Sequence, residues 1–230
     1  MNKSIDSGTG KRSMKFLLGL GAAVVLSWPA NAQSVPSTNP AELPQIRPGV
    51  VAGYIPRDKL VDSLALVPPP PAAGSAAQAV DDEARKAAVA QRDTARWKLA
   101  VRDADYTSPE AVDAFSCTIG VDISAEATPH LNMLLRRSLV DAGLATYKAK
   151  IHYNRTRPFV VANDNNICTP KEEEMLRKDG SYPSGHSALG WAWGLVLASI
   201  APDRADALLQ RAHAYGQSRV ICGVHWQSDV

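Results

Sequence analysis

The feature that most constrains the fold of this sequence is the helical spacing of its apolar residues after residue 75. Four leucines recur at the 3.6-residue period of one helix face, at Leu131, Leu134, Leu135 and Leu139. Thr128-Pro129 precedes them as an N-cap followed by proline at the first helical position. Gly143 either ends this helix or marks a bend. Runs with the two-residue period of a strand are few.

An alanine-rich stretch from Ala76 to about Asp105 also has a helical pattern. Asp81, Asp82 and Glu83 open it, and acidic residues are favourable near the N-terminus of a helix. This pattern predicts one long helix.

Three further helices are predicted towards the end of the chain. A short one starts at Thr169-Pro170 and reaches Lys178. Residues 187–200 are strongly apolar and predict a buried helix, and residues after Pro202 carry Leu208, Leu209, Ala212 and Tyr215 on one side. We therefore expect an all-α fold, a compact helical bundle formed by residues 75–230.

The first 32 residues have the pattern of a secretory signal peptide. Basic residues precede an apolar run from Phe16 to Trp28, which is too short to span a bilayer, and Ala30-Asn31-Ala32 resembles a cleavage site. We expect export to the periplasm or medium, with a retained membrane anchor as the alternative. Residues 33–74 form a Pro/Ala-rich arm whose four prolines at 68–71 favour polyproline II, as a spacer or a protein-binding motif.

The charge of the chain gives no indication of nucleic-acid binding. Residues 1–32 contain four of the 25 Lys and Arg residues and one of the 23 Asp and Glu residues. The remainder is therefore close to neutral and lacks the basic footprint of a nucleic-acid-binding protein.

Three cysteines, Cys117, Cys168 and Cys222, predict one disulfide and one free thiol in an oxidising compartment. Cys222 lies between Arg219 and His225, where tight packing is expected. We therefore predict that Cys222 stays reduced and that Cys117 pairs with Cys168. Their wide spacing disfavours a zinc site.

Three short segments carry the residues that suggest chemistry: Lys150 with Arg157-Pro158, then Pro183-Ser184-Gly185-His186, then Ser218-Arg219 with His225 and Asp229. Each has a simpler reading by itself. The basic residues could form a solvated surface, the second segment a turn, and the last pair a surface contact on one helix face.

Together the segments match the needs of phosphoryl transfer. Lys150, Arg157 and Arg219 supply positive charge for phosphate oxygens. Ser184 and Gly185 precede a predicted helix, whose N-terminal N–H groups favour an anion, and Gly185 allows close backbone approach.

Two histidines supply a nucleophile and a proton donor. Asp229 can hold the Nδ1 proton of His225 and leave Nε2 free to attack phosphorus, while His186 acts as the general acid. His130, His152 and His213 lack such neighbours, and we expect them to be structural or exposed.

The segments resemble the signature K-x6-R-P, P-S-G-H and S-R-x5-H-x3-D of the type 2 phosphatidic acid phosphatase superfamily, and their surroundings resemble the class A bacterial non-specific acid phosphatases. The likeness covers roughly residues 60–230. It implies an acid phosphatase / vanadium haloperoxidase type of fold, possible homo-oligomers, and metal-independent hydrolysis of small phosphomonoesters without a cofactor. It also implies the roles described above for His225, His186, Asp229 and the phosphate-binding residues.

Other functions give different expectations. A lipid phosphatase of the superfamily needs several transmembrane helices, a haloperoxidase would bind vanadate in the same pocket, and a phosphate-binding protein would not need both histidines. Members of the family continue beyond the final aspartate, so we expect this chain, which stops at Val230, to be truncated and poorly active.

Overall fold

The computed structural model describes residues 35–47 and 49–230, so the predicted signal peptide lies outside the described part of the chain. The N-terminal half contains short 3-10 helices and a small hairpin followed by α-helices. Its elements are η1 (Pro40–Glu42), β1 (Gln45–Arg47), β2 (Val50–Val51), η2 (Arg57–Lys59), α1 (Ser63–Leu66), α2 (Ala76–Val89), α3 (Ala95–Ala104), η3 (Ala111–Phe115) and α4 (Ser116–Ile119).

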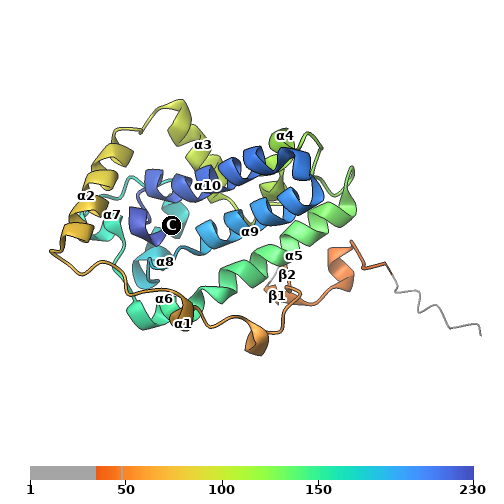
Figure 1. The fold of residues 1–230 in the computed structure, drawn as a ribbon, viewed down its shortest axis with the longest axis horizontal. Coiled ribbons are helices and arrows are strands. Elements are labelled where there is room, and N and C mark those ends of the chain that lie inside the picture. The colour runs from red at the N-terminus through yellow and green to blue at the C-terminus, as the bar shows by residue number, and fades with distance from the viewer. Residues whose placement is uncertain (1–34, 48) are drawn as a thin grey trace, which may run out of the picture. The chain divides into compact units, whose positions relative to one another are not determined.

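The C-terminal half contains the three longest helices of the described residues and confirms the all-α prediction. Its elements are α5 (Pro129–Ala145), α6 (Tyr147–Tyr153), α7 (Pro158–Val161), η4 (Pro170–Glu172), α8 (Glu173–Lys178), α9 (Gly185–Ile200), η5 (Pro202–Arg204), α10 (Ala205–Ile221) and η6 (Gln227–Asp229). Helix α9 packs against both α5 and α10 (Figure 1).

The main hydrophobic core lies between η3, α5, α9 and α10. Leu135 and Leu139 of the predicted leucine stripe are buried there, together with Trp193 and Tyr215. The indole of Trp193 donates a hydrogen bond to the Leu135 carbonyl at 2.9 Å, which satisfies its one polar group inside the core.

The long helix predicted over residues 76–105 is two helices. Ser75 caps α2 by accepting from the Gln78 N–H, so α2 starts before the acidic residues rather than at them. Thr94 caps α3 by accepting from the Trp97 N–H, and Asp93 has a φ of 63°, which interrupts the helical path. The local hydrogen bond of Thr94 therefore competes successfully with the helix propensity of the surrounding alanines.

Two further helix predictions need correction. Pro129 does begin α5, but the Thr128 hydroxyl bonds the Asp122 carbonyl instead of capping the helix, and α5 continues past Gly143 to Ala145. Helix α9 is not buried all round: Trp193 is fully buried, whereas Trp191 is 45% exposed on another face. Among the described residues, no helix has both the length and the apolar character needed to cross a bilayer.

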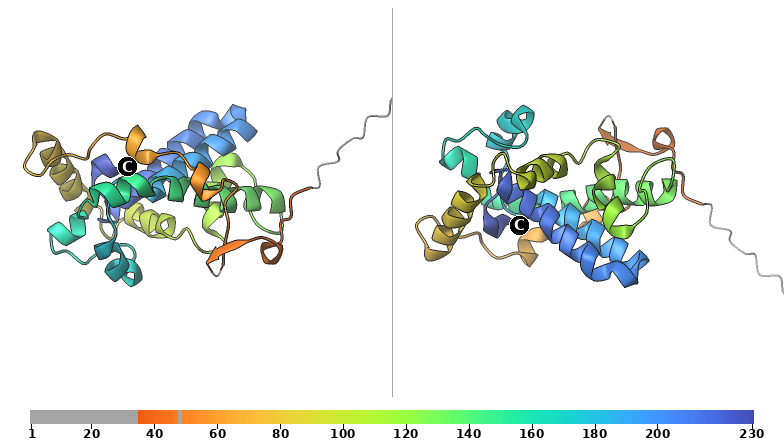
Figure 2. Two further views of the ribbon diagram at one scale, coloured as in Figure 1. Left: turned by 90° about the horizontal axis from the view of Figure 1, so that it is seen from below. Right: turned by 90° about the horizontal axis from the view of Figure 1, so that it is seen from above.

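The described residues of the arm, 36–47 and 49–74, pack against the helical part of the chain (Figure 2). β1 and β2 pair antiparallel, with Gln45 opposite Val51. The Arg137 side chain of α5 donates to the Ala52 and Gly53 carbonyls, and Asp141 accepts from the next two backbone N–H groups. These side-chain contacts hold the arm along α5.

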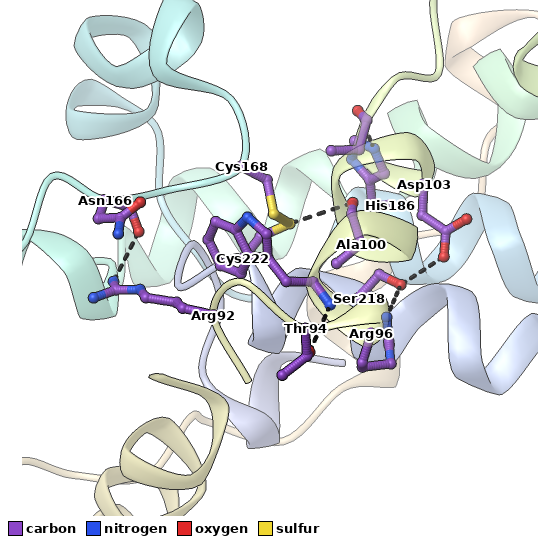
Figure 3. The surroundings of a disulfide bond; sticks show 12 residues. Arg92, Thr94, Arg96, Ala100, Asp103, Asn166, Cys168, His186, Ser218 and Cys222 are labelled. Carbon is purple, nitrogen blue, oxygen red and sulfur yellow. Dashed lines mark hydrogen bonds between the residues drawn. A yellow bond between two sulfur atoms is a disulfide. The ribbon is translucent and has the colours of Figure 1, made fainter. Parts of the chain in front are cut away.

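The cysteine prediction is wrong. Cys168 forms the disulfide with Cys222, the C-cap residue of α10 (Figure 3). Cys117 is free and exposed. Both bridged residues belong to a second hydrophobic cluster with Ala100 and Phe159. Tight packing around Cys222 was expected to keep it apart from other cysteines, but that packing brings Cys168 against it.

Candidate active site

A cavity of about 410 Å³ brings six of the eight predicted site residues together. We call it the cationic cavity, and the six are Lys150, Arg157, Gly185, His186, Arg219 and His225. They come from α6, the N-cap of α7, the start of α9, the end of α10 and the segment after α10. Ser184 and Asp229 lie behind its wall and line a neighbouring cavity.

The outer part of the cationic cavity is more apolar and aromatic. Tyr106, Leu144, Tyr147 and Met175 line it, and Ile46 of β1 extends the lining to the arm. A molecule that places an anion among the cations would therefore have its remaining atoms beside the arm.

The three cations are buried instead of forming a solvated basic surface. Lys150, Arg157 and Arg219 are each at most 4% exposed. Burial, followed by the positive charge of Arg157, lowers the pKa of Lys150 to about 8 and that of Arg219 to about 10. Three cations held this close out of water favour an anion among them.

Arg157 and Lys150 are fixed by bonds to the loop before α9. Arg157 donates to the carbonyl and carboxylate of Asp179 and to the Gly180 carbonyl. Lys150 donates to the Gly180 and Pro183 carbonyls. The cations are therefore positioned before any ligand binds.

Arg219 differs, because its Nε and Nη1 atoms are buried and make no hydrogen bond in the structure. Unpaired buried donors are costly. An anion in the cationic cavity would satisfy them.

The start of α9 adds backbone donors to the same cavity. Ser184 is the N-cap, and its hydroxyl accepts from the Ser187 N–H. The N–H groups of Gly185 and His186 lie in the first turn, where no intrahelical acceptor exists. A Cβ built on Gly185 would meet protein atoms no closer than 3.6 Å, so the protein itself leaves room for one.

The contacts of His225 determine its tautomer. Nη1 of Arg157 lies 3.1 Å from Nε2 of His225, and because a guanidinium can only donate, Nε2 must accept. The proton of the neutral ring is then on Nδ1, leaving a lone pair on Nε2. Burial and the charge of Arg157 lower the pKa of His225 well below its usual value, which outweighs the effect expected from a nearby carboxylate.

Asp229 is near His225, but the two residues do not share a helix as predicted. α10 ends at Ile221, and Asp229 belongs to η6. Its Oδ2 lies 3.4 Å from Nδ1 of His225, a close contact without hydrogen-bond geometry, and accepts from the Trp226 N–H at 2.7 Å. A turn after α10 therefore replaces the expected helix face.

His186 is the second buried histidine of the cavity. Its Nε2 lies 3.0 Å from the Ala104 carbonyl, which can only accept, so Nε2 carries a proton. The ring packs against Tyr106 and Tyr215. Burial, then Arg219, lower its pKa well below the usual value. The other three histidines, His130, His152 and His213, are exposed.

The sequence interpretation missed two residues beside Asp229. Arg155 lies between Lys150 and Arg157 in the chain and was not singled out, yet its buried guanidinium bonds both Asp229 and Asp81 at 2.7 Å. Asp81 was assigned to the first turn of a helix, but it is inside α2 and 1% exposed. The sequence signal for a buried Asp81 was its spacing from Ala88. The two residues are seven apart and therefore share one helix face, and that face is buried.

Comparisons with known proteins agree on one family. Residues 130–230 match the PAP2 superfamily. The non-specific acid phosphatase of Providencia stuartii is 44% identical over 77% of this chain and 71% of its own length. The acid phosphatase of Zymomonas mobilis subsp. mobilis is 41% identical over 66% of this chain and 58% of its own length. The non-specific acid phosphatase of Salmonella typhimurium is 46% identical over 65% of this chain and 60% of its own length.

The chain thus spans less than two thirds of the latter two relatives. The all-helical fold, the signature segments gathered at one cavity, and these identities agree. This chain belongs to the class A bacterial non-specific acid phosphatases of the PAP2 superfamily.

Proposed function

We propose that this chain is an exported acid phosphatase that hydrolyses small phosphomonoesters without a metal ion, through a phosphohistidine on His225. The observation that carries the proposal is the unprotonated Nε2 of His225, held by Arg157 among three buried cations. The names of its relatives support the reaction class.

Binding of the phosphoryl group uses donors that are already in place. Its oxygens accept from Nε and Nη1 of Arg219, the atoms without partners in the structure. Lys150 has one N–H remaining after its two carbonyl bonds, and the N–H groups of Gly185 and His186 add backbone donors. These groups stabilise the charge that spreads over the three equatorial oxygens in the transition state.

In the first chemical step, Nη1 of Arg157 releases Nε2 of His225, and the Nε2 lone pair forms a bond to phosphorus as the bond to the ester oxygen breaks. His186, in its doubly protonated form, donates a proton to the leaving oxygen, and since Nε2 of His186 is bonded to the Ala104 carbonyl, this proton comes from Nδ1. The positive charge that develops on the His225 ring is stabilised by Asp229.

In the second step, His186 accepts a proton from water. The water oxygen bonds to phosphorus, and the bond between phosphorus and Nε2 breaks. Phosphate leaves, and both histidines return to their starting forms.

Trapping the intermediate tests this proposal. With p-nitrophenyl phosphate, whose leaving group needs little protonation, His186→Ala is expected to release a burst of p-nitrophenol and accumulate acid-labile, alkali-stable phosphate on His225. His225→Ala is expected to be inactive, whereas His213→Ala, at an exposed position on α10, retains full activity.

Label on another residue, or an active His225→Ala enzyme, contradicts the covalent assignment. Excess chelator is expected to leave the rate unchanged, and vanadate to inhibit because it adopts five-coordinate geometry. Loss of activity in chelator that a divalent metal restores contradicts metal independence.

A further inference from the structure

Behind His225, a chain of buried charges connects Asp229 to helix α2. Arg155 donates from Nη1 to Oδ1 of Asp229 and from Nη2 to Oδ2 of Asp81, both at 2.7 Å. The side chains are 8% exposed for Arg155, 1% for Asp81 and 0% for Asp229. None of the three lines the cationic cavity, so Arg155 and Asp81 touch neither substrate nor reacting atoms.

The two oxygens of Asp229 have different partners, which sets the plane of its carboxylate. Arg155 binds Oδ1, while Oδ2 accepts from the Trp226 N–H and faces Nδ1 of His225. Without Arg155, Oδ1 would lose its only charged partner among the described residues and the carboxylate could rotate about its Cβ–Cγ bond.

Arg155 is itself held from the other side by α2. Its Nη2 also donates to Oε1 of Gln78, at 2.7 Å, and its guanidinium lies 5.3 Å from the centre of the Trp226 ring. Asp81 additionally accepts from the N–H and hydroxyl of Ser228, next to Asp229 in the chain. Helix α2 therefore fixes both Arg155 and the backbone that carries Asp229.

Arg155 also supplies charge where it is needed. Burial raises the pKa of Asp229, and the charge of Arg155 is the main influence that lowers it. An ionised Asp229 is the form whose charge can stabilise a positively charged His225 ring.

We propose that Arg155 is a positioning residue, anchored by Asp81, that holds Oδ2 of Asp229 towards Nδ1 of His225, where the negative charge of Asp229 stabilises the positive charge that develops on the ring. The proposal rests on the phosphatase mechanism above. It adds a role for two residues outside the signature positions.

The kinetic test uses Arg155→Gln, with Arg177→Gln as the control for loss of a partly exposed, paired arginine. We expect Arg155→Gln to lower kcat by about 100-fold, the loss that a small misalignment of reacting groups produces. KM and the inhibition constant of phosphate should stay within about twofold, because the cationic cavity is intact. Arg155→Lys should recover part of kcat. It restores the positive charge, but a single ammonium group cannot reproduce the two separate guanidinium contacts with Asp229 and Asp81.

A double-mutant cycle tests whether Arg155 acts through Asp229. Adding Arg155→Gln to Asp229→Asn should cost little beyond Asp229→Asn alone, because residues acting as a unit are not additive. Full additivity, an unchanged kcat, or a kcat loss matched by weaker phosphate binding overturns the proposal.

A measurement without turnover separates this proposal from the phosphatase mechanism. Nitrogen NMR of ¹⁵N-histidine-labelled protein is expected to show His225 with a protonated Nδ1 in both proteins, because the contact of Nε2 with Arg157 is unchanged. A pH titration of the same signals is expected to show a lower pKa of His225 in Arg155→Gln, because Asp229 no longer faces Nδ1. An unchanged pKa of His225 overturns the positioning role even if His225→Ala is inactive. If Arg155→Gln does not fold, because it leaves two buried carboxylates unpaired, the combined Arg155→Gln and Asp81→Asn variant is measured instead and the same outcomes decide.

Discussion

At the scale of single residues, two glycines near the cationic cavity have opposite constraints. A Cβ on Gly185 would meet no protein atom closer than 3.6 Å, whereas a Cβ on Gly180 would lie 2.9 Å from the Lys150 carbonyl oxygen. Packing thus requires a glycine at position 180. Gly185 lines the cationic cavity, and no protein atom there excludes a Cβ.

This contrast predicts different defects for the two alanine variants. Gly185→Ala should keep the wild-type melting temperature but raise the inhibition constant of phosphate at least about tenfold, because its methyl group occupies ligand space. Gly180→Ala should lower the free energy of unfolding by about 1–3 kcal/mol through overpacking. Thermal unfolding and phosphate inhibition measured on both variants check this, and a destabilised Gly185→Ala protein would contradict it.

The two histidines predict an acid-shifted pH profile. The nucleophile must be neutral, so the rate falls below the pKa of His225, and the acid must be protonated, so the rate falls above the pKa of His186. Burial and neighbouring cations lower both values, which moves both limbs of the profile below the ordinary histidine pKa of about 6.5. Measuring kcat/KM from pH 3 to 9 tests this. An optimum above pH 7 would contradict it, because it would show that burial and the cations do not control the pKa values of the two histidines.

At the scale of elements, the disulfide joins the loop before η4 to the end of α10, three residues before His225. Closing a loop of this length stabilises a fold by about 2–4 kcal/mol. Replacing Cys168 and Cys222 together with serine should therefore lower the free energy of unfolding by about that amount in urea titrations. Cys117→Ser, at an exposed free thiol, is the control, and equal stability of all three proteins would refute a stabilising disulfide.

The helices that the sequence predicted well are those whose buried face shows as apolar residues recurring at the helical period. Leu135 and Leu139 mark the buried face of α5 without knowledge of any partner helix. The break between α2 and α3 was missed because alanine-rich sequence carries no such stripe and the signal is a single capping residue, Thr94. Cys168 and Cys222, 54 residues apart, meet only through tertiary packing.

The site was predictable where its chemistry is encoded by short spacing. The signature segments contain the six predicted residues of the cationic cavity because each segment is short, and its residues lie on one local structure, such as the N-cap turn of Ser184, or on directly adjoining ones. Arg155 and Asp81 were not identified, since their relationship exists only after α2 packs beside η6. The helix assumed for His225 and Asp229 was wrong because i and i+4 residues can also meet across a turn.

At the scale of the whole molecule, the contact of Asp81 with Ser228 spans 147 positions of the chain. Bringing such distant residues together is entropically expensive and occurs only when the intervening helices are in place. The orientation of Asp229 is consequently a global property of the fold. Enzymatic rate then serves as a sensor of complete folding: a refolding experiment should show helical signal returning first and turnover last, with the delay set by the docking of α2.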